Sequence, residues 1–572
     1  FPLKGKLLNV REATASQLIN NEEIKNIKKI LGLRQNVKYD NLNKLRYGGI
    51  IILADQDVDG THIKGLLINF FHYFWPSLVK VEGFIQSMAT PIIKGFKKND
   101  KKGKHTKIFY TLSEYNKWIE KISNPNGWHI KYYKGLGTSN QKEAKECFNN
   151  FENNLITYIW NENDKNNNNE PKLIQEDSVS SEESKDLEEE LRSTAADRNS
   201  ESYKAIMLAF EKKNADNRKK WLMDYNPNLI IENSEKRVTY SDFINKDLIH
   251  FSNYDNQRSI PSVTDGFKPS QRKIFFGSEK RNLYKDEVKV SQLAGFISDQ
   301  AAYHHGETSL QQAIVSMAHN FIGSNNINLL MPNGQFGTRR MGGKDSASPR
   351  YLYTKLNKLS SKIFRNEDKC IYKYIYDDGT KVEPENYSPI LPMHLVNGVH
   401  GIGTGYSTSI PCFNPEDIIN YILKRMNGKS FENMTELTPW YDGFTGSISK
   451  IKDSNSFECK GKYEIINTNT IKINEIPIGE WTYSYREYLD KITVEDVKKP
   501  KKGKIISVYR DDSGNNSINI TIEFINGVLQ DLIKKRSLEK VLKLNKKINI
   551  SNMYLYDPNK QLKKYNKISD IL

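Results

Sequence analysis

The chain is 572 residues long, with 85 basic and 69 acidic residues and a formal net charge of +16. This length exceeds what a single hydrophobic core supports, so about three or four domains are expected. The positive charge favours a polyanionic partner, most simply nucleic acid, although a soluble basic protein without such a partner would have the same composition. No apolar run reaches the length of a membrane span, and the four widely separated cysteines argue against a disulfide framework and a structural zinc site.

The first part of the chain has the pattern of an α/β domain. A helix is predicted from Asn21, its capping residue, to Leu31, and Gly32 ends it. A short β-branched strand follows at residues 49–54, and helical spacing of apolar residues resumes over 62–74. Another strand is predicted over 83–88, and this alternation of strands and helices is typical of α/β domains.

Three aspartates, Asp55, Asp57 and Asp59, follow the first predicted strand in alternate positions. Such dense negative charge is costly unless a divalent cation or a basic partner neutralises it. A solvated acidic turn is one alternative. An EF-hand loop is another, but Leu66 stands where that loop needs its twelfth-position glutamate. A Mg²⁺ site at the strand end is therefore favoured. Because neighbouring acids repel one another, replacing Asp57 with alanine is expected to leave the metal-free protein no less stable.

The middle of the chain changes composition twice. A strand followed by a basic, glycine-hinged loop is predicted over 131–139. Residues 161–200 are dominated by Asn, Ser and Glu and contain too little apolar surface to offset their ordering entropy, so they are predicted to be a disordered insertion. A helix is predicted over 203–221, ending in a cluster of basic residues.

Short helices dominate the next region and strands the last. Residues 288–296 and 308–321 are predicted to form a pair of helices, as in a helix-turn-helix or winged-helix unit. Strands are predicted further on, over 472–476, 505–509 and 518–524, with a hairpin turn at 511–514.

The candidate catalytic pair is Arg350 and Tyr351, in a segment rich in glycine and small residues. A phenol can attack a phosphodiester if the negative charge that develops is compensated, and the planar guanidinium fork of arginine matches phosphate oxygens. An Arg-Tyr pair alone is much more typical of a structural tyrosine than of a nucleophile. The setting in a basic domain adds modest support for the catalytic interpretation.

Two further motifs leave alternatives open. His304 and His305 are adjacent in the sequence, and adjacent side chains rarely bind the same metal ion. Phosphate contacts or packing are therefore favoured for them. Ile402 lies between Gly401 and Gly403, where an exposed apolar side chain on a flexible glycine tip would suit a wedge between base pairs. The alternative is that Ile402 packs into a protein core.

Taken together, the ordered motifs resemble the DNA-cleavage core of the type IIA DNA topoisomerases, in the single-chain eukaryotic or viral form rather than the split bacterial gyrase. The motifs that carry the resemblance cover nearly the whole chain outside the Asn-rich insertion. They are residues 2–11, 55–65, 133–138, 258–262, 268–273, 303–307, 334–339 and 348–351.

The resemblance implies a multidomain fold of the α/β plus α+β class. Its implied parts are a Rossmann-like TOPRIM metal-binding domain over 1–160, the insertion over 161–200, a basic helical linker over 201–242, a winged-helix domain over 243–365 and a mostly β tower domain over 366–572.

The resemblance also implies roles for individual residues. Tyr351 becomes the nucleophile and Arg350 its transition-state partner. Asp55 and Asp57 become ligands of Mg²⁺, which Mn²⁺ or Ca²⁺ can replace, and Asp59 becomes an outer-shell acid. Ile402 becomes the DNA-bending wedge. The implied DNA-contacting residues are Lys6, Asn9, Lys212, Lys213, Lys268, Arg272, Tyr303, His304 and His305.

The implied protein is a homodimer that shares its active sites between protomers, cuts both strands of double-stranded DNA through a 5′-phosphotyrosyl link and acts in the nucleus. In the full-length enzyme ATP would drive passage of a second duplex. The ATPase domain, a Glu-Gly-Asp motif with a further metal ligand and the exit gate are expected to lie outside this chain, which is thus expected to be a fragment. The rival functions are a metal nuclease that uses only the acids, and a non-catalytic DNA-bending protein.

Overall fold

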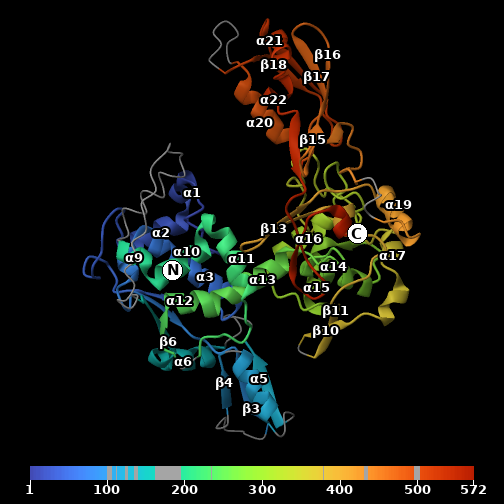
Figure 1. Ribbon diagram of the computed structural model, residues 1–572. Coiled ribbons are helices and arrows are strands. Elements are labelled where there is room, and N and C mark those ends of the chain that lie inside the picture. The colour runs from blue at the N-terminus through green and yellow to red at the C-terminus, as the bar shows by residue number, and fades with distance from the viewer. Residues whose placement is uncertain are drawn as a thin grey trace. The chain divides into compact units, whose positions relative to one another are not determined.

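The computed structural model describes residues 1–98, 106–110, 112–122, 127–133, 140–161, 195–232, 235–377, 379–430, 436–494 and 503–572. The chain forms two compact units, Phe1–Asp255 and Asn256–Leu572, whose elements are labelled in Figure 1. No helix in the described ranges combines the length and apolar character needed to span a membrane. The predicted basic loop at 134–139 and most of the predicted insertion lie outside the described residues.

The first unit is organised around a four-stranded mixed sheet in the order β1-β2-β6-β7. The strands are β1 (Ile50–Ile52), β2 (Ile85–Met88), β6 (Leu155–Ile159) and β7 (Arg237–Thr239). Strand β1 pairs with β2 in parallel, β2 with β6 antiparallel, and β6 with β7 in parallel. The strand, acidic loop, helix and strand predicted for this region are confirmed.

Two helices of this unit show how local sequence fixes their ends. Helix α2 (Glu22–Leu31) begins where the side chain of Asn21 accepts a hydrogen bond from the Ile24 amide and ends at Gly32, with φ of 75°, as predicted. Helix α3 (Val58–Phe74) begins four residues before the predicted start, because the Asp57 side chain caps it. Apolar spacing alone does not detect such a cap.

The first unit also contains a second sheet and several short helices. A second, three-stranded antiparallel sheet has the order β4-β3-β5. The other elements up to residue 161 are α1 (Ala15–Asn20), α4 (Pro76–Val79), β3 (Ile93–Lys97), β4 (Thr106–Phe109), α5 (Leu112–Lys121), β5 (Trp128–Tyr132), α6 (Gln141–Asn149) and α7 (Phe151–Asn154).

The segment 195–242 corrects two predictions. Residues Ala195–Asn199 form helix α9, so the disordered insertion predicted over 161–200 extends too far at its C-terminal end. The helix predicted over 203–221 is two helices, α10 (Glu201–Phe210) and α11 (Ala215–Met223), joined by the 3₁₀ turn η3 (Lys212–Asn214). This segment is not a linker, because apolar side chains of α10 are buried in the same core as α3 and the sheet.

The chain then continues through α12 (Tyr240–Asp242), the π-helical turn η4 (Phe243–Leu248) and α13 (Ile249–Ser259), the helix in which the two units meet along the chain. The helical part of the second unit packs around one core with three main helices. They are α14 (Pro269–Lys280), α15 (Val290–Gln300) and α16 (Glu307–Ala318).

Residues Val288–Lys289, predicted as helix, instead form strand β8, which pairs antiparallel with β9 (Tyr353–Thr354). The helix pair is consistent with the predicted helix-turn-helix or winged-helix unit, whose bounds of 243–365 stay a prediction.

Strands dominate the rest of the second unit, as predicted. A four-stranded antiparallel sheet has the order β16-β17-β19-β18, with β16 (Lys462–Ile465), β17 (Thr470–Glu475), β18 (Ile506–Asp511) and β19 (Ile520–Phe524). Every second residue of β17 is buried, which is the pattern of a sheet with one face on a core. Helix α20 (Thr482–Ile492) packs beside β18 (Figure 1). The predicted hairpin turn at 511–514 lies between two antiparallel neighbours.

The second unit also contains further strands and short helices. They are α17 (Ser360–Ile363), η5 (Asn366–Cys370), β10 (Tyr374–Asp377), β11 (Thr380–Pro384), α18 (Met393–Val396), β12 (Val399–Ile402), β13 (Ser407–Ile410), α19 (Pro415–Met426), β14 (Ser447–Lys450), β15 (Ser456–Lys460), α21 (Val528–Lys534), α22 (Leu538–Val541), β20 (Asn545–Asn549), β21 (Met553–Tyr556), β22 (Leu562–Tyr565) and η7 (Ile568–Asp570).

A buried histidine in α18 makes the stability of the second unit depend on pH. Neither ring nitrogen of His394 has a hydrogen-bond partner among the described residues. Burial lowers the pKa of His394 from 6.5 to about 4, because the charged imidazolium is poorly solvated there. The unfolded chain therefore binds a proton more readily than the folded chain between these two values.

We expect the free energy of unfolding to fall as the pH is lowered from 6.5 towards 4, by about 3 kcal/mol from His394 alone. Replacing His394 with glutamine, which does not titrate, should flatten this part of the pH profile. Urea unfolding at several pH values, followed by near-ultraviolet circular dichroism, measures the difference. Equal slopes for parent and variant would show that His394 does not have a lowered pKa.

Candidate active site

The acidic loop after β1 is held by two local contacts. Asp57 Oδ1 accepts a hydrogen bond of 2.7 Å from the Gly60 amide at the start of α3. Asp59 Oδ1 lies 2.5 Å from the Nζ of Lys6. The positive end of the α3 dipole also favours carboxylates here. The three aspartates thus sit at a helix N-terminus with part of their charge already compensated.

This loop fits a divalent cation only in part. Asp55 and Asp57 supply hard carboxylate oxygens at one strand end, the donor type that Mg²⁺ prefers. Asp59 is committed to Lys6, in keeping with a place outside the metal's inner ligands. Across the described ranges, no three His, Cys, Asp or Glu side chains gather closely enough to hold a metal. The two aspartates are therefore candidate ligands that need a further donor.

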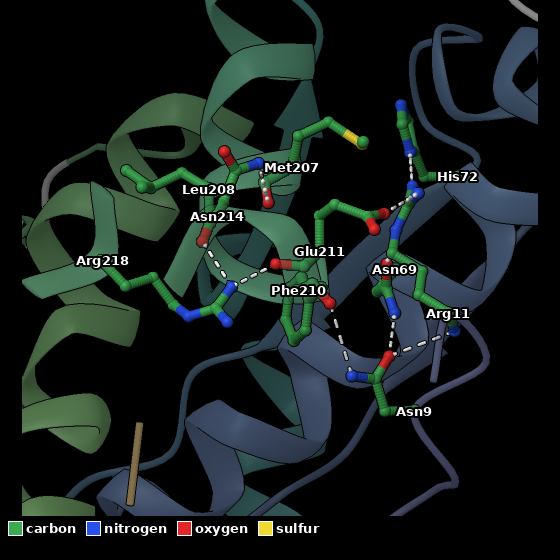
Figure 2. A network of polar contacts seen from close by, with 10 residues as sticks. All are labelled: Asn9, Arg11, Asn69, His72, Met207, Leu208, Phe210, Glu211, Asn214 and Arg218. Atoms are coloured by element: carbon green, nitrogen blue, oxygen red, sulfur yellow. Dashed lines mark hydrogen bonds and ion pairs between the residues drawn. The ribbon is translucent and has the colours of Figure 1, made fainter. Parts of the chain in front are cut away.

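A buried polar network connects the second half of α3 to other segments of the first unit (Figure 2). Arg11 is its centre, with a side chain that is 1% exposed. Its Nε donates to Asn69 Oδ1 at 2.7 Å, its Nη2 to His72 Nδ1 at 2.8 Å, and its Nη1 approaches Glu211 Oε2 at 3.5 Å. Since a guanidinium only donates, His72 accepts at Nδ1. Burial and the charge of Arg11 lower the pKa of His72 and keep it neutral.

The same network joins two segments that were predicted to contact DNA. Asn69 Nδ2 donates to Asn9 Oδ1 at 3.0 Å, and Asn9 Nδ2 makes a long hydrogen bond of 3.5 Å to the Phe210 carbonyl. Arg218 Nη1 donates to the Glu211 carbonyl at 2.6 Å, at the entrance to turn η3 (Figure 2). Turn η3 exposes Lys212 and Lys213. The Asn9 segment and the two lysines therefore belong to one rigid part of the first unit.

Tyr351 and Arg350 lie on the surface of the second unit. The side chain of Tyr351 is 69% exposed, and the Arg350 guanidinium lies 5.9 Å from the centre of its ring. The Tyr351 amide donates to the Ser348 carbonyl at 2.9 Å, which turns the backbone here. A tyrosine kept for packing would be buried, whereas this phenol is open to an external substrate.

Arg272, which is predicted to contact DNA, is engaged in contacts within the protein. Its side chain is buried, and its Nε and Nη2 donate to the two carboxylate oxygens of Asp265 at 2.7 and 3.0 Å. The Phe267 carbonyl accepts a third hydrogen bond from this guanidinium. These three hydrogen bonds occupy the Nε and Nη2 donors of the buried Arg272 and leave only the two N–H groups of Nη1, so the observed contacts are structural and a DNA contact stays a prediction.

The other predicted DNA-contacting side chains of this unit lie at or near the surface. Lys268 Nζ donates to the His400 carbonyl at 2.8 Å, and burial lowers the pKa of Lys268. His304 Nε2 pairs with Asp377 Oδ2 at 3.0 Å. The rings of Tyr303 and His305 meet edge to face, with centroids 5.4 Å apart. All four residues remain predicted contacts.

Ile402 is 70% exposed, which excludes the alternative that it packs into a core. It does not lie on a flexible tip, however. It ends strand β12 and pairs with Ser407 of β13. A Cβ on Gly401 would lie 2.2 Å from the Ser259 carbonyl oxygen, and one on Gly403 would lie 2.1 Å from Asn256 Oδ1. The two glycines therefore let the hairpin lie directly against α13, and Ile402 projects from a supported strand.

Sequence reasoning missed the residues that hold these side chains in place. Arg11 lies within one of the motifs that carry the resemblance, but its partner Asn69 is 58 positions away. Asn256 supports the Ile402 hairpin through a hydrogen bond of 3.0 Å to the Thr404 carbonyl, 148 positions away. Neither pairing has a periodic or local signal in the sequence.

The cap on α3 changes the expectation for Asp57. We now expect Asp57→Ala to lower the stability of the metal-free protein by about 1 kcal/mol, the usual cost of losing an N-cap. Asp57→Asn should keep the cap and remain close to the parent in stability. Both should weaken Mg²⁺ binding, measured by calorimetry alongside thermal unfolding. An alanine variant as stable as the parent would show instead that repulsion among the aspartates dominates.

Family models cover nearly the whole chain. Residues 1–86 match the Toprim domain, and residues 88–176 and 173–256 match the C-terminal associated domain of TOPRIM. Residues 258–572 match the family of the A subunits of DNA gyrase/topoisomerase IV, and this match alone spans more than half of the chain. The predicted TOPRIM domain and the mixed multidomain fold class are confirmed, and a Toprim domain indicates use of a divalent metal.

Individual relatives agree with these matches. The chain is 44% identical to the DNA topoisomerase 2 of Acanthamoeba polyphaga mimivirus, covering 100% of the chain and 50% of that protein. It is 42% identical to the mitochondrial DNA topoisomerase 2 of Dictyostelium discoideum, covering 100% of the chain and 41% of that protein. The chain thus spans half or less of the length of these curated relatives.

A solved structure extends the comparison to three dimensions. The crystal structure of the Plasmodium falciparum topoisomerase II DNA-binding, cleavage and re-ligation domain matches with a TM-score of 0.72 and 42% identity. The match covers 100% of this chain and 71% of that chain. Together with the family models, it shows that the chain belongs to the type IIA DNA topoisomerases and corresponds to their cleavage core.

Proposed function

We propose that this chain makes a transient double-strand break in DNA by tyrosine transesterification. The observation that carries the proposal is the exposed phenol of Tyr351 beside the Arg350 guanidinium, in a chain that also has an acidic Toprim strand end. Exposure gives a phosphodiester access to the nucleophile, and the cation beside it suits the charge of the reacting phosphate.

The reaction exchanges one phosphodiester for another. The phenolic oxygen of Tyr351 attacks phosphorus and loses its proton, while the bond to the 3′ oxygen breaks and the 3′ oxygen leaves as a hydroxyl. The 5′ phosphate stays linked to Tyr351. Because one P–O bond forms for each that breaks, the reverse reaction can reseal the strand without an external energy source. Arg350 neutralises charge on the non-bridging oxygens.

We propose that Asp55 and Asp57 hold Mg²⁺, or Mn²⁺ or Ca²⁺ in its place. When bound, such an ion supplies Lewis-acid polarisation of phosphate oxygens. The contribution of this chain is to fix the donors: Asp57 is tied to the first turn of α3, and Lys6 compensates Asp59. A further donor is needed, because no third His, Cys, Asp or Glu side chain among the described residues joins these two aspartates.

Double-stranded DNA is the proposed partner. Phosphate contacts are assigned to a set of mostly exposed side chains on both units, and the net charge of +16 supports them through release of counterions. Ile402 is proposed as the bending wedge. The assigned phosphate-contacting residues are Lys6, Asn9, Lys212, Lys213, Lys268, Tyr303, His304 and His305.

Several further features belong to the proposal for the longer protein. They are the ATP-driven passage of a second duplex, a homodimer with active sites shared between protomers, and action in the nucleus. The names of the relatives support topoisomerase activity, but one of these relatives is mitochondrial. Fluorescent tagging of the full-length protein would decide the compartment, and light scattering its oligomeric state.

We expect Tyr351→Phe to abolish the protein-linked DNA end while duplex affinity changes by less than about threefold, because affinity is spread over many phosphate contacts. Denaturing gels of labelled DNA, before and after protease treatment, detect the adduct in the full-length enzyme. Tyr353→Phe, two residues away, is the matched control and should still form it. Cleavage without a protein-linked end would favour the metal nuclease, and binding without cleavage by the parent would favour the non-catalytic bending protein.

We expect Ile402→Ala to straighten bound DNA and to reduce cleavage. Bending a short duplex costs on the order of 1–6 kcal/mol, and the exposed side chain of Ile402 is proposed to offset part of this by entering a base step. Energy transfer between dyes at the duplex ends measures the bend. Ile419→Ala, at another exposed isoleucine, is a control that should leave the bend unchanged. Unaltered bending by the Ile402 variant would assign the wedge to another residue.

A further inference from the structure

The segment before Tyr351, residues 333–350, folds into a compact loop that we call the nucleophile loop. The Thr338 amide and Oγ1 donate to the Asp345 carboxylate at 2.9 and 2.6 Å. The Gly343 amide donates to the Thr338 carbonyl at 3.0 Å. A Cβ on Gly337, which has φ of 108°, would lie 2.6 Å from the Gly343 backbone. The loop therefore closes on itself with backbone in direct contact.

The base of this loop is connected directly to the proposed nucleophile. The Asn333 and Tyr353 backbones exchange two hydrogen bonds, of 3.0 and 3.1 Å, and the Ala347 amide donates to the Gln335 carbonyl at 2.9 Å. Tyr351 lies between Ala347 and Tyr353 in the chain. A displacement of the loop would therefore displace the backbone that carries the phenol.

A buried ion pair connects the far end of the loop to the β-rich part of the same unit. Arg339 Nη2 pairs with Glu475 Oε1, at the end of β17, and donates to the Ile476 carbonyl at 3.2 Å. The two side chains are 2% and 3% exposed. The other carboxylate oxygen, Oε2, accepts hydrogen bonds of 3.2 Å from the amide and the Oγ1 of Thr445. Thr445 therefore orients the Glu475 carboxylate independently of Arg339.

A second contact lies beside the ion pair. A Cβ on Gly342 would lie 2.4 Å from the ring of Trp481, just before α20, so the loop backbone rests on the indole. The Tyr483 amide, in the first turn of α20, donates to the Arg340 carbonyl at 2.9 Å. A further contact to the loop comes from His319, whose Nε2 donates to the Phe336 carbonyl at 2.9 Å. The nucleophile loop is thus held in place by contacts with Trp481, Tyr483 and His319.

We infer that Arg339 and Glu475 are positioning residues for Tyr351: their ion pair fixes the nucleophile loop on β17 and the start of α20. The inference rests on the proposed function of Tyr351. Buried ion pairs contribute little net stability compared with apolar packing, but the partners must meet in one geometry. Transesterification needs such a geometry, since a shift of about 1 Å in a reacting group can cost about a hundredfold in rate.

The rival explanation is that the pair only stabilises the fold. A control exists in the same unit, where Arg272 and Asp265 also form a buried ion pair, with side chains 9% and 0% exposed. Asp265 also accepts a hydrogen bond of 3.0 Å from the Tyr387 amide, and Arg272 donates to the Phe267 carbonyl. These partners lie outside the nucleophile loop. Breaking either pair removes a buried carboxylate charge, but only Glu475 is bonded to the loop.

The test compares Glu475→Gln with Asp265→Asn in the full-length enzyme. The measurements are the thermal midpoint, the duplex Kd and the single-turnover rate of adduct formation at saturating DNA. We expect both variants to lose thermal stability and to keep Kd within about threefold of the parent. Glu475→Gln should slow adduct formation at least about tenfold, whereas Asp265→Asn should stay within about twofold.

Equal rates for the two variants would overturn the inference, as would an adduct rate for Glu475→Gln equal to that of the parent. If Glu475→Gln fails to fold, Thr445→Val decides instead, because it removes one hydrogen bond that orients Glu475 and leaves the ion pair. We expect it to slow adduct formation about threefold, and an unchanged rate would contradict the inference. A parent enzyme that forms no adduct would refute the proposed function itself, which is a distinguishable result.

Discussion

The guanidinium groups of Arg11 and Arg339 are both buried, and neither can lose its proton to escape the cost of burial. Each must therefore meet its acceptors in a fixed arrangement, or the fold bears the full desolvation penalty. Arg11 meets Asn69, His72 and Glu211, and Arg339 meets Glu475 and the Ile476 carbonyl. In both cases the acceptors come from distant parts of the chain. The segments that carry the proposed functional residues are consequently set by long-range polar contacts.

Close backbone approach has a similar effect where no charge is buried. Gly401 and Gly403 bring the Ile402 hairpin against α13, and Gly342 brings the nucleophile loop against Trp481. A side chain at any of these positions would have to occupy space already filled by backbone, by a neighbouring side chain or by an indole ring. Glycine is therefore required by contact at these positions, in addition to any freedom in φ. This also explains how Ile402 can be both exposed and rigidly supported.

Features that depend on local sequence could be predicted, and features that depend on distant partners could not. Asn21 and Gly32 set the ends of α2 through contacts within a few residues, and the alternation in β17 follows from its one buried face. The Arg350 and Tyr351 pair and the three aspartates could be proposed as site residues because each group lies within a few residues of the sequence. The burial of Arg272 could not be predicted, because its motif gives its charge but not its partner, Asp265, which lies in the core. Residues 201–242 were predicted to be a linker from their basic residues, but α10 in this segment also has an apolar face that is buried in the core.

The candidate metal ligands and the nucleophile belong to different compact units of the chain. Neither unit holds all of the groups that the proposed reaction needs, so precision within each unit is a precondition for bringing them to one phosphate. Asp57 is fixed by the helix it caps, and Tyr351 by the loop it ends. The structure thus accounts for the local placement of each reactive group within its own unit.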